Sequence, residues 1–417
     1  MTAEIAILNT HGVALAADSA ITVRVGGENK VYNTANKVFT LSKYHPVGIM
    51  IYNKATYMGI DWEIIIKEFR KTLEKDKFNS LFDYANNFIK YVEEYRLITE
   101  EQQKDALFSM CYNIISLIRH SFFYEIEKKF NLIENITQRQ AAPVLNSIIK
   151  NIQNQQKNMN EKADYILDID FIEKYKTDIY KIIDDLFENN KISMNQKKNI
   201  LEIIKSDISK YNHLYNYSGI VIAGYGDEEI YPSIYQCKIC GKFGKSFILF
   251  NEEKDSVSYE NTAFIMPFAQ SEMVHTFMRG IDPDFHDKID EQLENFMLSL
   301  SGIIDNSYKS KLMKVKNEFV EYINKLQQKY YVNPIMEVVR SLQKLDLAEM
   351  AETLVNLTAF KRHISKDAET VGGPTDVAVI TKGDGFVWIK RKHYFDIKLN
   401  QYFLENYFME DTNDKNL

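Results

Sequence analysis

The apolar residues of this chain gather in short runs near its two ends, with a long block at helical spacing between them. Near the beginning, two apolar runs flank the turn Thr10-His11-Gly12, and the second run ends at Asp18. A second pair of runs, NKVFTLS and PVGIMIY, follows and closes at Asn53. Short apolar runs that are bounded by turn residues predict paired β-strands. We therefore expect two strand pairs up to Asn53.

The block that follows has a helical pattern. A first helix is expected from about Lys54 to Lys75. Its apolar residues Ile60, Ile64 and Phe69 recur near helical spacing. From there to about residue 215 the pattern predicts helices and no strand. Three capping boxes mark helix starts: Thr99 to Gln102, Thr137 to Gln140, and Ser193 to Gln196.

Helices are expected again in the later part of the chain. Asn333 is the expected N-cap of one, because Pro334 would then occupy the first helical position. The segment LAEMAETLVNLTAFKRHISKD carries an apolar stripe of Leu347, Met350, Ala351, Leu354 and Val355. The order of strand pairs, helices, strands, helices and a final hairpin predicts an α+β fold, a four-layer αββα sandwich of two sheets covered by helices on both sides. An all-α insertion interrupts it.

Composition narrows the classes of partner. The chain has 417 residues, a formal net charge of -7 and 45% hydrophobic residues, and it holds no apolar run long enough to span a bilayer. Mild acidity argues against a large phosphate-binding face. We therefore expect a cytoplasmic protein that binds neither membrane nor nucleic acid.

The three cysteines are too few for a disulfide framework and fit a reducing compartment. Cys237 and Cys240 form a C-x-x-C, but a zinc site needs four ligands and no second C-x-x-C exists. The pair lies inside the hairpin pattern YPSIYQCKICGKFGKSFILF, which favours a structural role. The eight histidines show no metal-ligand spacing, and no glycine-rich phosphate loop is present. We predict neither a metal nor a cofactor.

Thr2 is the strongest candidate for chemistry. Removal of Met1 would leave a threonine with a hydroxyl nucleophile and a free α-amine as its base. Thr2 and Ala3 are small, which favours trimming of Met1, and no apolar signal segment precedes them. An α-amine has a pKa of about 8, some two units below a lysine, and a nearby ammonium lowers that pKa further. Asp18 and Lys37, at the ends of predicted strands, are expected to converge on it.

The segment GVALAADS resembles the N-terminal region of proteasome β-type subunits, the threonine-peptidase branch of the N-terminal nucleophile (Ntn) hydrolases. In that family the nucleophile is the first residue of the mature chain, and an aspartate follows sixteen residues later, as Asp18 follows Thr2. The family's active-site lysine corresponds to Lys37, with Lys30 as the alternative. The resemblance implies an Asp18–Lys37 pair that tunes the terminal amine.

The segment KDAETVGGPTDVAVITKGDGFVWIKRKHYF resembles the closing unit of that family. Asp367 matches its aspartate and Thr370 its serine, and both are expected to hydrogen-bond around the terminal amine. Gly372 and Gly373 match the turn into the strand DVAVIT, which pairs with FVWIKR, and Gly372 is a supporting residue of the site. The segment GIVIAGYGDEEIYPSIYQC resembles the family's middle hairpin.

Two segments depart from the family pattern. Asn53 replaces a glycine whose backbone N–H binds the oxyanion. The backbone donor survives if its geometry does, and Asn tolerates unusual dihedrals. The segment MPFAQSEMVHTFMRGID replaces a Gly-Ser-Gly turn, with Ala269 or Gln270 in place of its serine and Ser271 one or two residues later.

The resemblance implies a threonine-type peptidase or amidohydrolase that acts on peptide or unfolded protein. Ile21, Ile51 and Ala55 match the specificity pocket and favour an apolar residue before the cut bond. Family members form rings, so a homo-oligomer is expected. A small-molecule amidase on the same fold and a catalytically inactive scaffold are the alternatives.

The resemblance divides the chain into a discontinuous core and an insertion. The core comprises residues 1–75 and 216–400, the helical insertion 76–215, and the C-terminal tail 401–417. The apolar residues of the insertion are expected to form a core of its own, and the alternative is a surface that binds a regulatory partner.

Overall fold

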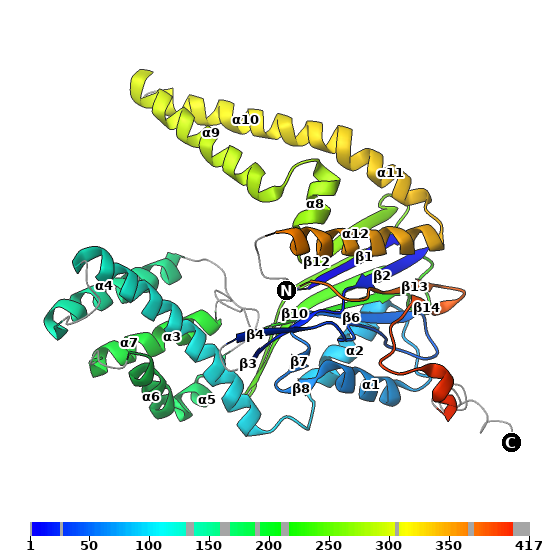
Figure 1. The fold of residues 1–417 in the computed structure, drawn as a ribbon, viewed down its shortest axis with the longest axis horizontal. Coiled ribbons are helices and arrows are strands. Elements are labelled where there is room, and N and C mark those ends of the chain that lie inside the picture. Colours follow the sequence, from blue (N-terminus) through cyan, green and yellow to red (C-terminus); the bar gives the residue numbers. More distant parts are fainter. Residues whose placement is uncertain are drawn as a thin grey trace.

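The computed structural model describes residues 2–25, 28–130, 137–158, 167–187, 192–209, 217–304, 308–365 and 371–402. Within them the protein is a mixed α+β structure built on two five-stranded antiparallel sheets (Figure 1). The first sheet has the order β12-β1-β2-β13-β14. Its strands are β12 (Ala263–Ala269), β1 (Ala3–Asn9), β2 (Gly12–Ala17), β13 (Asp376–Thr381) and β14 (Gly385–Lys390).

The second sheet has the order β11-β10-β9-β6-β5. Its strands are β11 (Ser246–Ser256), β10 (Ser233–Phe243), β9 (Ser218–Gly224), β6 (Val47–Asn53) and β5 (Val38–Thr40). Two further sheets have two antiparallel strands each. One ribbon pairs β3 (Ile21–Val25) with β4 (Glu28–Tyr32), and the other pairs β7 (Thr56–Tyr57) with β8 (Ile60–Asp61). The strand pairs expected from the apolar runs are therefore present, and the antiparallel α+β class is confirmed.

The period-two alternation of β1 separates two faces of the first sheet. Ala3, Ile5 and Ile7 pack with helical residues, while Ala6 and Leu8 belong to an apolar cluster shared with the second sheet. Successive side chains of a strand point to opposite faces. Even-numbered residues of this segment therefore face the second sheet.

Helices cover the outer faces of the sheets. α12 (Lys344–Ile364) packs on β1 and β2 through its apolar stripe, which the sequence predicted. α1 (Trp62–Leu73) and α2 (Leu81–Glu93) share an apolar cluster with the second sheet. Figure 1 shows α12 above the first sheet and α1 and α2 below the second. The assignment of α2 to the insertion stays a prediction, as does the division into domains.

The expected helix from Lys54 to Lys75 is wrong at its beginning, because the β7–β8 ribbon occupies its first turns. Met58 and Gly59 both have positive φ, at 50° and 87°. Two-residue hairpin turns use such backbone angles and a helix cannot. The helix therefore starts at Trp62, and its buried face differs from the expected one: Ile64 is exposed.

A helical block lies to one side of the sheets (Figure 1). It contains α3 (Glu100–Phe130), α4 (Gln138–Asn158), α5 (Ile169–Lys174), α6 (Lys176–Phe187) and α7 (Met194–Ser209). The three predicted capping pairs hydrogen-bond at the starts of α3, α4 and α7. The block buries its own apolar cluster, which also takes in Phe243, Ile248 and Phe250 of the second sheet.

The remaining helices link β12 to α12. They are α8 (Glu272–Arg279), α9 (Pro283–Ile304), α10 (Lys309–Gln327), a π-helical turn (Gln328–Val332) and α11 (Asn333–Ser341), and a 3₁₀ turn (Ile397–Leu399) follows β14. α9 and α10 form a projecting hairpin (Figure 1). The predicted N-cap at Asn333 is wrong, since Val332 and Asn333 are both helical. The π turn instead lets the chain stay helical into Pro334. No helix among the described residues is long and apolar enough to cross a membrane.

Candidate active site

Thr2 lies immediately before β1, an interior strand of the first sheet. It is 4% exposed. Its carbonyl accepts a hydrogen bond from the Gln270 N–H at 3.1 Å, and the next N–H, that of Ala3, donates to Asp18 Oδ1 at 3.1 Å. These bonds on both sides fix the backbone, so Thr2 is an ordered part of the sheet.

Asp18 follows β2 and gathers backbone donors from three parts of the chain. Its carboxylate accepts from Ala3, from Ala20 at 3.2 Å and from Gly372 at 2.9 Å. It is 1% exposed. Gly372, predicted to support the site, thus supports it through Asp18.

Lys37 supplies the positive charge of the site. It precedes β5, is 5% exposed and donates to Asp18 Oδ1. Its Nζ also lies 3.2 Å from Glu4 Oε1. The alternative lysine, Lys30, is exposed in the β3–β4 ribbon. The structure therefore brings Lys37, and not Lys30, to Thr2 and Asp18.

Glu4 is a member of this cluster that the sequence reasoning missed. Its Oε2 accepts a hydrogen bond from Thr2 Oγ1 at 3.0 Å, and its side chain is fully buried. Burial raises the pKa of Glu4 to about 7, against the lowering effect of Lys37; the Asp18 charge raises this pKa further and the Thr2 hydrogen bond lowers it. A carboxyl group thus contacts the candidate nucleophile directly.

A signal for Glu4 was present in the sequence. Residues two apart on a strand share a face, so Glu4 had to lie on the same face as Thr2. An acid inside an otherwise apolar strand also needs a buried partner. The sequence pattern predicted only Asp18, the acid at the end of the next strand, as the carboxylate of the site.

Asn53 ends β6 close to Thr2, with a positive φ of 70°. Its side-chain amide donates to the Tyr217 carbonyl at 2.8 Å. The backbone thus adopts the unusual dihedral that the sequence reasoning attributed to Asn at this point. The side chain is held by the neighbouring segment.

A small cleft opens at Thr2. Its volume is about 10 Å³, which is the size of a single water site. The predicted specificity residues Ile21, Ile51 and Ala55 all line it, and the whole lining is Thr2, Ala20, Ile21, Ala35, Lys37, Ile51, Tyr52, Asn53, Lys54 and Ala55. The structure thus gathers the predicted side chains around the hydroxyl, in a narrow space.

The remaining predicted residues divide into two groups. Asp367 and Thr370 lie outside the described residues. Ser271 is the N-cap residue of α8, and its carbonyl accepts from the His275 N–H at 2.9 Å. The backbone contact to Thr2 comes from the preceding residue, Gln270.

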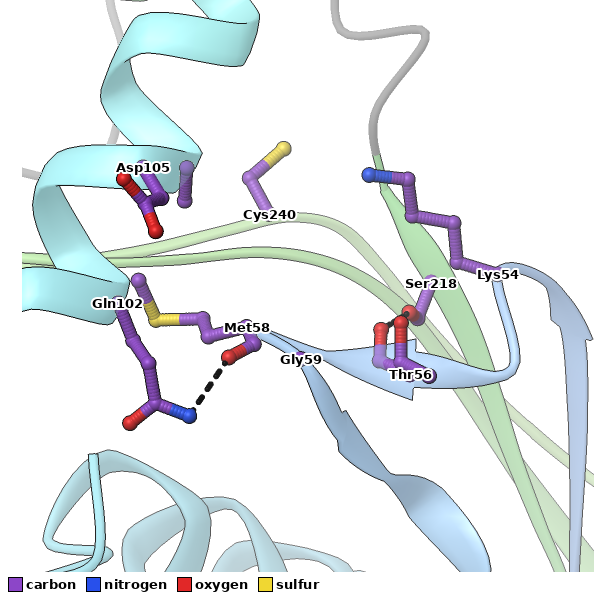
Figure 2. Close-up of a pocket in the computed structure, with 9 residues that line it drawn as sticks. Lys54, Thr56, Met58, Gly59, Gln102, Asp105, Ser218 and Cys240 are labelled. Atoms are coloured by element: carbon purple, nitrogen blue, oxygen red, sulfur yellow. Dashed lines mark hydrogen bonds between the residues drawn. The ribbon is translucent and has the colours of Figure 1, made fainter. Parts of the chain in front are cut away.

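A larger pocket of about 230 Å³ lies next to the cleft (Figure 2). Lys54 borders both. The pocket is also lined by Asp105 and by Cys240, and Figure 2 shows Cys240 between Lys54 and Asp105. Burial raises the pKa of the Cys240 and Cys237 thiols to about 12. Both cysteines of the C-x-x-C lie in β10. Among the described residues, no group of three or more His, Cys, Asp or Glu side chains is arranged to hold a metal ion.

Comparison with known proteins gives little support for any family. No protein-family model matches the chain, and no curated protein matches it. Among solved structures, Anbu (ancestral beta-subunit) from Yersinia bercovieri aligns over 97% of this chain and 94% of its own, at 8% identity and a TM-score of 0.26. A likeness this distant carries no argument.

The assignment to the threonine-peptidase branch of proteasome β-type subunits is therefore wrong. No family model supports it, and the structural match is too weak to replace one. The two motifs that carried the resemblance, GVALAADS and VGGPTDVAVIT, contribute to antiparallel strand pairs in this structure. Such hairpins follow from alternating apolar runs and occur in many folds. The chemistry of the site rests on its own residues.

Proposed function

We propose that this protein is an amidohydrolase whose nucleophile is the hydroxyl of Thr2. One observation carries the proposal: a buried, hydrogen-bonded threonine hydroxyl lines a cleft beside a buried ammonium, Lys37, and two carboxylates, Glu4 and Asp18. Burying a charged side chain costs free energy unless the charge is paired and hydrogen-bonded, and such buried charges are frequent at functional sites. A hydroxyl needs such surroundings to attack an amide.

The proposed base is the α-amine of Thr2, freed by removal of the residue before it. An α-amine has a pKa of about 8 and is partly neutral at physiological pH. The Lys37 ammonium lowers that pKa by repulsion. Asp18 holds both the Ala3 N–H and Lys37, so it fixes the amine relative to the charge that tunes it.

The proposed oxyanion donor is the backbone N–H of Asn53. Its positive φ turns the end of β6 toward the cleft that it lines with Thr2. Because the Asn53 side chain is bonded to Tyr217, the main chain is the better candidate. A fixed donor of this kind stabilises the tetrahedral intermediate.

The cleft indicates the size of the substrate group. The cleft is narrow and is lined by the apolar side chains of Ile21, Ile51 and Ala55, so we propose that a small apolar residue precedes the cut bond. A peptide with this residue is the first candidate. A small-molecule amide is the second, and the narrow cleft is the observation that favours it.

The proposal extends to the architecture and the assembly. The layer order α12, first sheet, second sheet, and α1 with α2 supports a four-layer αββα arrangement. Because α2 packs on the second sheet, the proposed insertion begins after it and comprises α3 to α7. We propose that the protein is cytoplasmic. We also propose that it self-associates through the α9–α10 hairpin. It exposes apolar side chains at Phe285, Ile289, Phe296, Phe319 and Tyr322, and sedimentation velocity would show a monomer if this is wrong.

Labelling with a β-lactone tests the nucleophile. Intact mass first establishes that Thr2 is the terminal residue, and the probe is then expected to add to Thr2 and to no other hydroxyl. Thr2→Ala should lose the adduct, while Thr2→Ser keeps it. A wild-type chain with a free Thr2 that takes no label, or a label that persists in Thr2→Ala, would contradict the proposal.

A further inference from the structure

Glu4 lies in β1, and Thr2 is the residue immediately before that strand. Thr2 Oγ1 donates to Glu4 Oε2 at 3.0 Å. The backbone of Glu4 is paired on both sides, with Phe268 on β12 and Ala17 on β2. Residues two apart on a strand point the same way. The contact is thus built into the sheet and needs no movement of a loop.

Glu4 and Asp18 differ in how their oxygens are occupied. Asp18 accepts from the backbone of Ala3, Ala20 and Gly372 and from Lys37. Lys37 donates a hydrogen bond to Asp18, and its Nζ lies 3.2 Å from Glu4 Oε1. Glu4 accepts no backbone hydrogen bond of this kind from the described residues, and it contacts the Thr2 hydroxyl directly. Glu4 is therefore the carboxylate that is placed to take the hydroxyl proton.

We propose that Glu4 is a second catalytic proton acceptor, which takes the proton of Thr2 Oγ1 as the hydroxyl attacks. The inference rests on the proposed nucleophile, Thr2, and adds an acceptor that exists whether or not the α-amine is free. The nucleophile and a base are then neighbours at the beginning of one strand.

The step balances as a general-base reaction. Thr2 Oγ1 forms a bond to the carbonyl carbon, the C=O π pair moves to oxygen, and the Oγ1 proton moves to Glu4 Oε2. When the intermediate collapses, the C–N bond breaks and the leaving nitrogen takes its electron pair and the proton from Glu4. Water then attacks the ester, gives a proton to Glu4, and Glu4 returns it to Thr2 Oγ1.

The environment of Glu4 sets the pH range of this step. Lys37, Asp18 and the phenol of Tyr52 face it, and burial first and then neighbouring charges, Glu4 among them, raise the pKa of Tyr52 above its ordinary value. The raised pKa of Glu4, about 7, lies near the optimum for a base that works at neutral pH. Labelling of Thr2 should therefore rise with pH through about this value.

The test is the rate of β-lactone labelling at Thr2 across pH, in chains whose Thr2 amine is free and in chains that retain Met1. Glu4→Gln should lower the rate constant by about 10²–10⁴-fold. It should also remove the limb of the pH–rate profile, which is the rise in labelling rate near pH 7. Chains that retain Met1 should still label, at a rate that depends on Glu4. Glu202→Gln, an exposed acid on α7 paired with Lys205, is the matched control and should label as the wild type does.

Glu4→Asp keeps the carboxylate and shortens its reach. It should label at an intermediate rate with a displaced limb, and it decides the question if Glu4→Gln fails to fold. Wild-type rate and an unmoved limb in both Glu4 variants would overturn the inference while Thr2 stays the nucleophile. An unlabelled wild type would instead refute the proposed function, so the two failures are distinguishable.

Discussion

The cleft at Thr2 and the pocket at Cys240 are neighbours that share Lys54, and they differ in volume and in the chemistry of their other residues. The cleft at Thr2 has a volume of about 10 Å³ and lies beside a buried cluster of Glu4, Asp18 and Lys37. The pocket at Cys240 has a volume of about 230 Å³ and a thiol whose pKa burial raises to about 12. The larger space thus holds a protonated thiol, while the buried, paired charges lie at the smaller one, and the proposed chemistry is assigned to the charges rather than to the volume.

The physical reason is the cost of desolvation. Moving an ion out of water costs several kcal/mol unless a partner and hydrogen bonds compensate. Lys37 pairs with two carboxylates, and the backbone of the sheets supplies donors to Asp18. The Cys240 thiol meets burial by staying protonated, which leaves it a weak nucleophile.

The largest expected effect comes from Lys37→Met. The substitution leaves Glu4 and Asp18 buried without their counter-charge and should destabilise the fold by about 3–5 kcal/mol. Urea denaturation measures it. Lys67→Met, which breaks an exposed pair with Glu63, should cost below about 1 kcal/mol. Equal effects would remove the contrast between buried and exposed charge.

The pH dependence of stability is the next effect. The folded state raises the pKa of Glu4 from 4.5 to about 7, so the folded protein favours the protonated carboxyl. This contribution is fully present below pH 4.5 and is lost as the pH rises through about 7, by on the order of 3 kcal/mol. Urea midpoints across that range should show the decline, and Glu4→Gln should flatten it. An equal decline in Glu4→Gln would assign it to other groups.

Gly219→Ala tests the packing of Tyr52, a residue that lines the cleft at Thr2. A Cβ at Gly219 would lie 2.0 Å from Cζ of Tyr52, which lines the cleft. Overpacking of this kind costs about 1–3 kcal/mol, and displacement of Tyr52 should slow the labelling of Thr2. Gly383→Ala adds its Cβ in open space and is the control. Identical melting curves for both variants would show that the Tyr52 ring moves aside without a cost in stability.

Cys240→Ser should have the smallest effect. With a thiol pKa of about 12, iodoacetamide at neutral pH should alkylate Cys240 far more slowly in the folded chain than in the unfolded one, because the thiolate is the reactive species. The serine variant should label at Thr2 at the wild-type rate. Fast alkylation followed by mass spectrometry, or a loss of Thr2 labelling, would make the larger pocket part of the site.

Local pattern sufficed for much of this fold. The alternating runs around Thr10 and Gly12 formed β1 and β2, and the stripe from Leu347 to Val355 became the buried face of α12. The cluster of Thr2, Asp18 and Lys37 was also anticipated, because strand ends that are close along the chain tend to pair. Each of these expectations depends on nearby residues.

Expectations that depended on backbone detail were less successful. The turn at Met58 and Gly59 needs positive φ, which a pattern of apolar residues does not reveal. The N-cap expected at Asn333 was replaced by a π turn that continues the preceding helix. In both places the backbone adopts a conformation that the apolar pattern does not encode.

The sequence by itself determined where the main strand pairs lie, because short apolar runs bounded by turn residues are a local property of the chain. It also contained the parity that puts Glu4 beside Thr2. Only the tertiary structure decided that Glu4 is fully buried, that Lys37 pairs with two acids, and that the cleft has a volume of about 10 Å³. Burial, charge pairing and cavity volume arise between segments distant in sequence, and these quantities set the pKa that the proposed chemistry needs.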